Sequence, residues 1–244
     1  DGTFAAKVDF AGGSSARSIA MGDVNGDGRL DLVTNLAVLL GNGNGTFATK
    51  VDFTTGLNAD PRAVAIGDLN GDGQLDLAVA NAGNGGTVSV LLGNGTGAFN
   101  THTEYAAGAG ATSVAIADMN GDGKLDLAVA NATAGTVSVL LGNGNGTFAA
   151  TTNYGAGVQA NSVAIGDFDG VGGPDLAVAN PNSFNVSVLL NASTNLSATL
   201  NLLVRDSELL WVTYFLSPYA GGLYKIALAI INLVMVPITP FIST

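Results

Sequence analysis

Oxygen-bearing side chains recur at a fixed spacing in short loops of this sequence. The first loop, residues 23–31, carries Asp23, Asn25, Asp27 and Asp31 at its positions one, three, five and nine, with glycine at position six. Arg29 at position seven offers its main-chain carbonyl. Hard oxygen donors at alternating positions around a glycine turn suit Ca²⁺, which binds about six to eight oxygens. The loop therefore predicts a calcium site.

Two further loops, residues 68–76 and 118–126, repeat this frame. The expected ligands of the second loop are Asp68, Asn70, Asp72, Gln74 (through its carbonyl) and Asp76. Those of the third loop are Asp118, Asn120, Asp122, Lys124 (through its carbonyl) and Asp126. One loop of this composition is usually an ordinary turn, because Asp, Asn and Gly favour turns. Three matched copies favour about three structural Ca²⁺ sites, each tying two strands together.

The fourth loop, residues 167–175, keeps only part of the pattern. Asp167, Asp169 and Asp175 remain, but Val171 replaces the aspartate at position five and Pro174 precedes the last aspartate. We therefore expect weak metal binding, or none, in this loop.

Two other calcium motifs are excluded by position and spacing. An EF-hand needs a glutamate at position twelve, where this sequence has Thr34, Val79 and Val129. Stacked calcium nonapeptides place their loops back to back. Here the leading aspartates of the four loops are 45, 50 and 49 residues apart, a period that indicates a repeat architecture.

The elements that must position these loops are short strands. Each unit contains runs of four to eight residues rich in Val, Ile, Leu and Thr, bounded by Gly and Asn, which predicts four antiparallel strands per unit. No amphipathic helix is expected before about residue 200. The fold class is therefore all-β, a β-propeller-type array of four-stranded antiparallel blades. An open stack or sandwich of hairpins is the alternative.

Two features of the first unit bear on whether a ring closes. Its middle hairpin, between Asp31 and Leu39, is shorter than that of the second unit, so the blade could be incomplete. Residues 1–4 match the expected fourth strand at residues 45–47 and 146–148. The sequence thus enters a blade at its fourth strand, and either the two ends join to close a ring or earlier blades precede.

The C-terminal residues differ in composition from the repeats. We divide the chain into a repeat domain, residues 1–193, and a hydrophobic segment, residues 194–244, in which Lys225 is the only charge after residue 208. Its two apolar stretches approach the length needed to span a bilayer but are interrupted by Pro and Gly. It could be a membrane anchor, an assembly element buried between subunits, or a foreign tail joined by a sequence error.

Composition excludes several functions. The net charge of −11, with only 8 Lys and Arg, argues against nucleic acid as a partner. Without cysteine there is no disulfide or thiolate site. The single histidine, His102, reads as a surface residue, and the sequence lacks a nucleophile elbow, a phosphate-binding loop and a zinc-protease motif. No catalytic residues are predicted, and the protein is expected not to be an enzyme.

The units resemble FG-GAP or VCBS-type repeats, the blades of the integrin α-subunit propeller. The resemblance covers about residues 1–192 and rests on the DxNxDGxxD loop followed by LAVAN and LLGNGxGTF. It implies Ca²⁺ in the loops, a propeller that usually has seven blades, and a role in adhesion or ligand binding.

These observations lead to two expectations for function. The first is an extracellular or cell-surface, calcium-stabilised binding module that recognises a protein or glycan through its loop rims and contacts a membrane through its tail. The second is a self-assembling structural subunit of an extracellular filament or surface layer, packed through the same tail. Three equivalent turns carry possible glycosylation sites, Asn44, Asn94 and Asn145.

Overall fold

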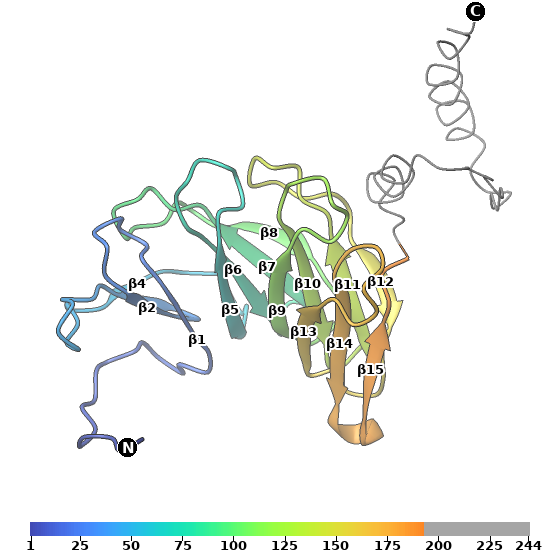
Figure 1. Cartoon of the computed structure of the whole chain (residues 1–244), viewed down its shortest axis with the longest axis horizontal. Helices are drawn as coiled ribbons and strands as arrows, with labels where there is room; N and C mark the ends of the chain where they lie inside the picture. Colours follow the sequence, from blue (N-terminus) through green and yellow to red (C-terminus); the bar gives the residue numbers. More distant parts are fainter. Residues whose placement is uncertain (193–244) are drawn as a thin grey trace, which may run out of the picture. The chain divides into compact units, whose positions relative to one another are not determined.

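The computed structural model describes residues 1–192, which fold into four antiparallel β-sheets (Figure 1). The first sheet contains β1 (Ile19–Gly22), β2 (Asp31–Thr34), β3 (Ala37–Leu39) and β4 (Val51–Asp52). The second contains β5 (Pro61–Gly67), β6 (Asp76–Asn81), β7 (Thr87–Leu91) and β8 (Thr103–Ala106). The third contains β9 (Ala111–Ala117), β10 (Asp126–Asn131), β11 (Thr136–Leu140) and β12 (Thr152–Gly155). The fourth contains β13 (Ser162–Gly166), β14 (Asp175–Asn180) and β15 (Asn185–Leu189), with a 3₁₀ turn, η1 (Pro181–Ser183), before β15.

The second strand of each unit lies at the centre of its sheet. Every residue of β6 and of β10 is buried, because neighbouring strands flank the strand and neighbouring sheets cover both of its faces. A strand buried on both faces has a nearly continuous apolar sequence rather than an alternating one, as DLAVAN does. Its alternate alanines keep one face flat, so that sheets can approach closely.

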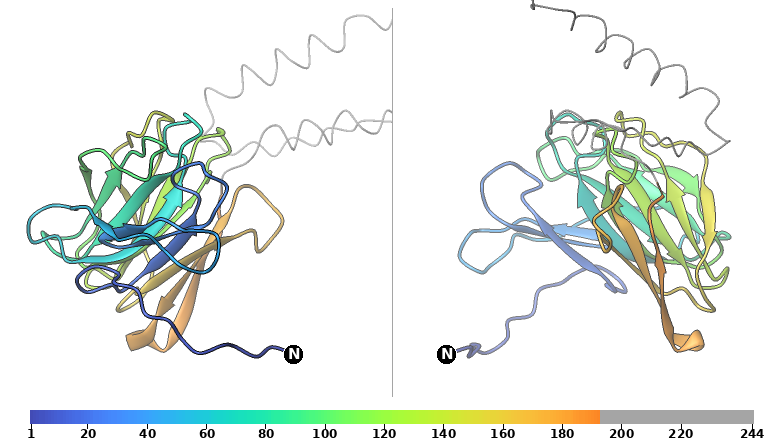
Figure 2. Two further views of the ribbon diagram at one scale, coloured as in Figure 1. Left: turned by 90° about the vertical axis from the view of Figure 1, so that its left-hand side faces the viewer. Right: turned by 45° about the vertical axis from the view of Figure 1, so that its right-hand side comes forward.

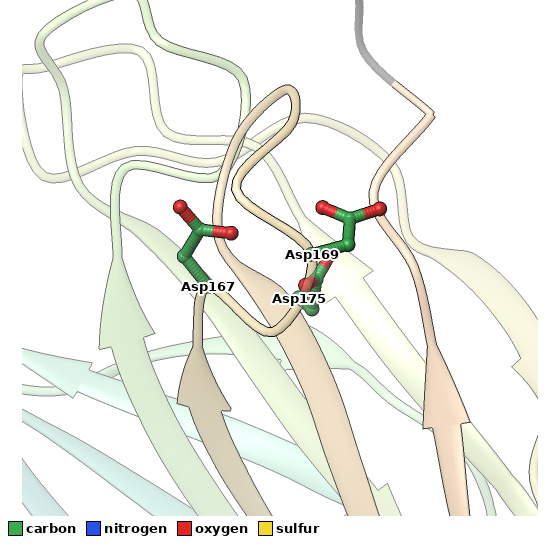
Figure 3. Close-up of side chains that lie close together, drawn as sticks. All are labelled: Asp167, Asp169 and Asp175. Carbon is green, nitrogen blue, oxygen red and sulfur yellow. The ribbon is translucent and has the colours of Figure 1, made fainter.

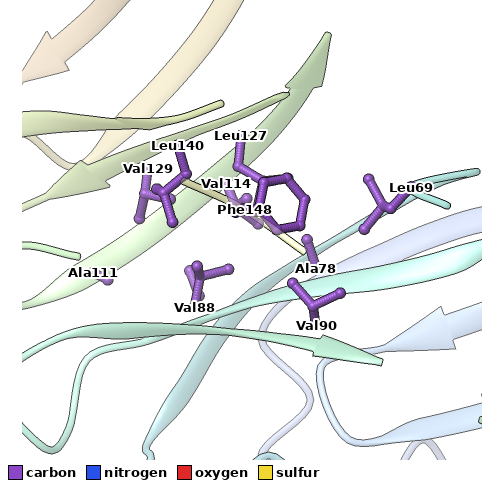
Figure 4. Close-up of a cluster of buried hydrophobic side chains, with 11 residues drawn as sticks. Leu69, Ala78, Val88, Val90, Ala111, Val114, Leu127, Val129, Leu140 and Phe148 are labelled. Atoms are coloured by element: carbon purple, nitrogen blue, oxygen red, sulfur yellow. The ribbon is translucent and has the colours of Figure 1, made fainter. Parts of the chain in front are cut away.

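The hydrophobic core lies between consecutive sheets. The first strands β1, β5, β9 and β13 contact one another in that order. Each cluster of buried side chains draws on two sheets: Leu69, Val88 and Val90 of the second sheet pack with residues of the third (Figure 4). The residues contributed by the third sheet include Val114, Leu127, Val129, Leu140 and Phe148. Each sheet therefore depends on its neighbours for burial, as expected for a repeat array.

The structure confirms the all-β fold and the four units, with two differences from the expectation. The first sheet has all four strands despite its short hairpin. The fourth sheet has three strands within the described residues. The four sheets form an open series in which the first and the last each leave one face uncovered, so no closed ring is formed by residues 1–192 (Figure 2).

The predicted hydrophobic segment, residues 194–244, lies outside the described residues. Within residues 1–192 there is no helix long and apolar enough to cross a membrane.

Candidate metal centre

The four acidic loops connect the first and second strands of the four sheets. Asp68 follows β5 and Asp76 begins β6, and the other three loops are placed in the same way. Because equivalent strands of consecutive sheets pack side by side, the loops emerge at the same edge of the array. The repeat therefore places every predicted ligand in an equivalent local environment.

The aspartate at position nine fastens each loop to its sheet. It is fully buried in all four units, as Asp31, Asp76, Asp126 and Asp175. In the third loop, Asp126 Oδ2 accepts the backbone N–H of Met119 (2.8 Å), and its Oδ1 accepts that of Gly142 (2.7 Å). Sequence reasoning treated this residue only as a ligand and missed this role. The recurring glycine after the third strand (Gly41, Gly93, Gly142) was the available signal.

The covered and uncovered copies of this aspartate differ electrostatically. Burial raises the pKa of Asp76 and of Asp126 above the usual range, although each accepts two backbone N–H bonds that act in the opposite direction. At Asp175 the hydrogen bonds from the N–H groups of Asn191 and Phe168 prevail and lower the pKa. Among the described residues no further sheet packs over this last loop, so desolvation is weaker there.

The donors at positions one, three and five are organised by bonds within the loop. In the second loop, Asp68 accepts the backbone N–H groups of Asp72 (3.2 Å) and Gly73 (2.9 Å). Asn70 Oδ1 also accepts the Asp72 N–H (2.9 Å), and Asp72 Oδ1 accepts that of Gln74 (2.8 Å). The first and third loops repeat this network. The protein thus holds these oxygens in place on one tight turn.

Glycine at position six allows that turn. Gly73 has a φ of +82°, a left-handed conformation that disfavours side chains. A Cβ atom there would meet nothing within 4 Å, so backbone conformation rather than space selects glycine.

The residue at position seven also contributes to the charge balance of the first and third loops. Arg29 and Lys124 place their cationic groups 3.8 Å and 3.5 Å from the carboxylates of Asp27 and Asp122. The backbone N–H of Lys124 donates to Asp122 and is the main reason why the pKa of Asp122 is lowered. Asp122 is therefore ionised at neutral pH, as a metal ligand must be.

The fourth loop brings its three carboxylates closest together (Figure 3). One oxygen from each of Asp167, Asp169 and Asp175 lies within 4.8 Å of the others, and this is the only such acidic cluster in the described part of the chain. The three carboxylates are close enough to share an ion, and weak or absent binding at this loop stays a prediction. Part of the reason for the cluster is chemical, because position three is a carboxylate in Asp169 and an amide in the other loops.

The donor set of the loops fits Ca²⁺ better than a softer metal. All the side-chain donors are carboxylate or amide oxygens, and flexible oxygen sites are typical for this ion. Positions one, three and five would hold it in the first three loops, and Asp167 with Asp169 in the fourth. Because both oxygens of each position-nine aspartate accept N–H bonds, its part as a ligand stays a prediction.

The remaining predicted residues are the three possible glycosylation sites and the single histidine. Asn44, Asn94 and Asn145 are exposed, and each accepts bonds from the threonine two residues later. His102 is half-buried rather than on the surface, and its Nδ1 has no hydrogen-bond partner. Within residues 1–192, no acidic cluster of this kind occurs besides Asp167, Asp169 and Asp175.

Comparison with protein families identifies the repeat. The FG-GAP-like repeat matches four segments, residues 1–34, 34–79, 68–129 and 118–178, which together cover most of the chain. The chain belongs to the FG-GAP-like repeat family. Comparison with curated proteins gave no match. The resemblance to FG-GAP repeats inferred from the sequence is confirmed, and each family match spans strands of neighbouring sheets.

Proposed function

We propose that this FG-GAP-like protein is a non-enzymatic binding or adhesion module of the extracellular space that Ca²⁺ stabilises. The observation that carries the proposal is that the same backbone N–H groups donate to the side chains at positions one, three and five in three loops. Random acidic turns would not share donors, acceptors and distances in this way.

Calcium supplies positive charge where the fold concentrates negative charge. Each of the first three loops holds three carboxylates, whose mutual repulsion opposes folding unless a cation offsets it. Exposed extracellular calcium sites commonly have dissociation constants of about 10⁻⁴ to 10⁻³ M, so millimolar Ca²⁺ would fill them. This affinity range is the reason for placing the protein outside the cell or on its surface.

The rims of the sheets are the surfaces available for a ligand. Strands buried on both faces, such as β6 and β10, leave only their connecting loops to make contacts, and loops on a rigid scaffold commonly carry binding residues. A protein or a glycan is the expected partner class. The exposed turns at Asn44, Asn94 and Asn145 would carry glycans in a host that adds them.

The test is thermal unfolding of the full chain in millimolar Ca²⁺ and in EDTA. We expect EDTA to lower the melting temperature, and Asp72→Ala and Asp122→Ala each to lower it in Ca²⁺ while reducing the response to EDTA. Asp9→Ala is the matched control, because Asp9 is exposed and outside the loops. An unchanged melting temperature after chelation and in both loop variants would contradict structural calcium.

A structural subunit of a filament or surface layer is the second candidate function. The observation in its favour is that the first and fourth sheets expose apolar side chains at both ends of the array, among them Met21 and Val186. The version of this hypothesis that relies on the hydrophobic tail concerns residues outside the described part.

A further inference from the structure

Three of the acidic loops carry an asparagine followed by a glycine at positions three and four. These pairs are Asn25–Gly26, Asn70–Gly71 and Asn120–Gly121. An asparagine before a glycine readily loses its side-chain amide in water, because glycine has no Cβ to hinder the approach of its backbone nitrogen. Asparagine is accordingly one of the thermolabile residues of proteins. The loops therefore hold three candidate sites of chemical modification at the same position of one frame.

Deamidation needs a free backbone N–H on the glycine. The glycine nitrogen gives up its proton to a base in the solvent and attacks the asparagine Cγ, and the side-chain nitrogen takes up a proton and leaves as ammonia. The resulting succinimide ring adds one water molecule and opens at either carbonyl. One product is aspartate, and the other is isoaspartate, in which the main chain runs through the side-chain carbons. One water is consumed for each ammonia released, and nothing is oxidised or reduced.

In the second and third loops this N–H is engaged in a hydrogen bond. Gly71 donates to Asp68 Oδ1 (2.8 Å), and Gly121 donates to Asp118 Oδ1 (2.8 Å). The bond must break before the nitrogen can attack. The carboxylate also opposes removal of the proton, because the nitrogen would become an anion beside an existing negative charge. Both effects protect the asparagine that precedes the glycine.

The first loop lacks this protection. Asp23 Oδ1 accepts the N–H of Asp27 (3.0 Å), and its Oδ2 accepts that of Gly28 (2.7 Å). Within residues 1–192 the N–H of Gly26 has no acceptor. Gly26 is also exposed to solvent. Of the three loops, the first therefore presents a glycine nitrogen that is free to react.

Sequence and backbone conformation do not account for this difference. All three loops read Asn-Gly-Asp-Gly from position three to position six. The glycine at position four has a φ of +72°, +76° and +74° in the first, second and third loops. In each loop the asparagine Oδ1 accepts the backbone N–H of position five, at 3.1, 2.9 and 3.0 Å. The acceptor of the glycine N–H is what separates the first loop from the other two.

Nearby charge and exposure do not single out the first loop either. Arg29 and Lys124 approach the position-five carboxylates of the first and third loops alike. Asn120 is exposed, whereas Asn25 is half-buried. Exposure alone would therefore make Asn120 the more reactive residue, so the hydrogen bond and exposure predict opposite orders for this pair.

We propose that Asn25 is a site of spontaneous deamidation and that hydrogen bonding of the following glycine protects Asn70 and Asn120. The aspartate product would give the first loop the carboxylate at position three that the fourth loop has in Asp169. The isoaspartate product adds one atom to the main chain inside the turn and would displace the oxygens at positions three and five. Modification thus yields chains with a more acidic first loop and chains in which that loop is distorted.

Other Asn–Gly pairs lie outside the four loops, among them Asn44–Gly45 and Asn94–Gly95. The Oδ1 of each asparagine accepts two bonds from the threonine two residues later, one from its N–H and one from its hydroxyl. These residues are not predicted metal ligands. Deamidation there would leave the acidic loops unchanged.

One consequence rests on the proposed function. A Ca²⁺ ion in the first loop would hold Asn25 Oδ1 and so keep the Asn25 side chain from turning toward the Gly26 nitrogen. At about ten times its dissociation constant, the ion leaves about a tenth of the loops empty, and deamidation of Asn25 should slow about tenfold. The effect of Ca²⁺ is therefore measured separately from the order of the three rates.

Tandem mass spectrometry of the full chain, incubated at mildly alkaline pH in EDTA, tests the proposal. Proteolytic fragments report how fast each asparagine gains the mass of a carboxylate. In the folded chain we expect Asn25 to convert at least about tenfold faster than Asn70 and Asn120, the scale set by one hydrogen bond to a charged group. In urea the three rates should become equal, because the local sequences are the same.

Replacing the acceptor tests the cause of the protection. Asp68→Ala frees the N–H of Gly71 and should raise the rate at Asn70 about tenfold. Asp23→Ala is the matched control, because Asp23 accepts no bond from the position-four glycine of its own loop; it should change the rate at Asn25 little. The rate at Asn120 shows in each variant whether the fold is intact, since unfolding would raise it.

Three outcomes would overturn the proposal. Equal rates at Asn25 and Asn70 in the folded chain would show that the hydrogen bond gives no protection. A faster rate at Asn120 than at Asn25 would assign reactivity to exposure. A difference that persists in urea would assign it to sequence. If Asn25 converts fastest in EDTA and Ca²⁺ does not slow it, the deamidation site is supported and calcium binding by the first loop is contradicted.

Discussion

The third and fourth acidic loops share one frame but differ in what surrounds them. Both end in a buried aspartate that accepts two backbone N–H bonds, Asp126 in the third loop and Asp175 in the fourth. A following sheet covers the third loop, and burial raises the pKa of Asp126, whereas hydrogen bonding lowers that of Asp175. The hydrogen bonds of the loop are therefore set by its local sequence. The pKa of its last aspartate depends instead on whether a further sheet packs over the loop.

The largest expected loss of stability comes from replacing the position-nine aspartate of the third loop, over which a following sheet packs. Asp126→Ala leaves two buried N–H groups without an acceptor and should lower the free energy of unfolding by about 3 kcal/mol. Asp175→Ala should cost less, because among the described residues no further sheet packs over this last loop. Urea unfolding in EDTA measures both without a contribution from metal. Equal losses would show that stacking does not matter at this position.

A gain-of-function change sharpens the comparison of the two loops as metal sites. Val171→Asp restores the carboxylate at position five of the fourth loop, and Val171 is 65% exposed, so the fold should tolerate it. We expect calorimetric titration to show tighter Ca²⁺ binding by about tenfold at one site, a typical effect of adding one charged ligand. Val158→Asp, at an equally exposed position outside the loop, is the control. No change in affinity would mean that Asp167, Asp169 and Asp175 already suffice or that the loop binds no Ca²⁺.

The smallest effect is expected at the opposite end of the array, where Asp60 joins the first two sheets. Hydrogen bonds from Arg62 and from Arg17 (2.7 Å) lower the pKa of Asp60. A lowered pKa in the folded state stabilises the protein above the unfolded value, about 3.9, and this stability is lost as the pH falls through the folded value.

Asp60→Asn should therefore cost about 0.5 kcal/mol at neutral pH, since the pair is exposed and screened by solvent. The difference from the unchanged protein should vanish once the pH has fallen below the lowered pKa of Asp60. Asparagine is the right replacement because residue 60 has a φ of +49°, which asparagine tolerates. Unfolding curves at several pH values measure this, and a difference that persists at low pH would assign the effect to packing instead of charge.

Much of this protein could be predicted from its sequence because its information is local and repeated. The loop frame at Asp68 and Asp118, the strand runs and the turn glycines recur in each unit, so strand pairing and the family could be inferred without coordinates.

Only the tertiary structure decided how the units end. The sequence shows that residues 1–10 resemble a fourth strand, but not which faces of the sheets remain open. Val64 is buried because a preceding sheet covers it, whereas Ile19 at the equivalent position of the first sheet is exposed. In the same way the pKa of Asp126 is raised and that of Asp175 is lowered. Burial depends on neighbours that are distant in sequence, so identical residues in identical loops acquire different properties according to their place in the array.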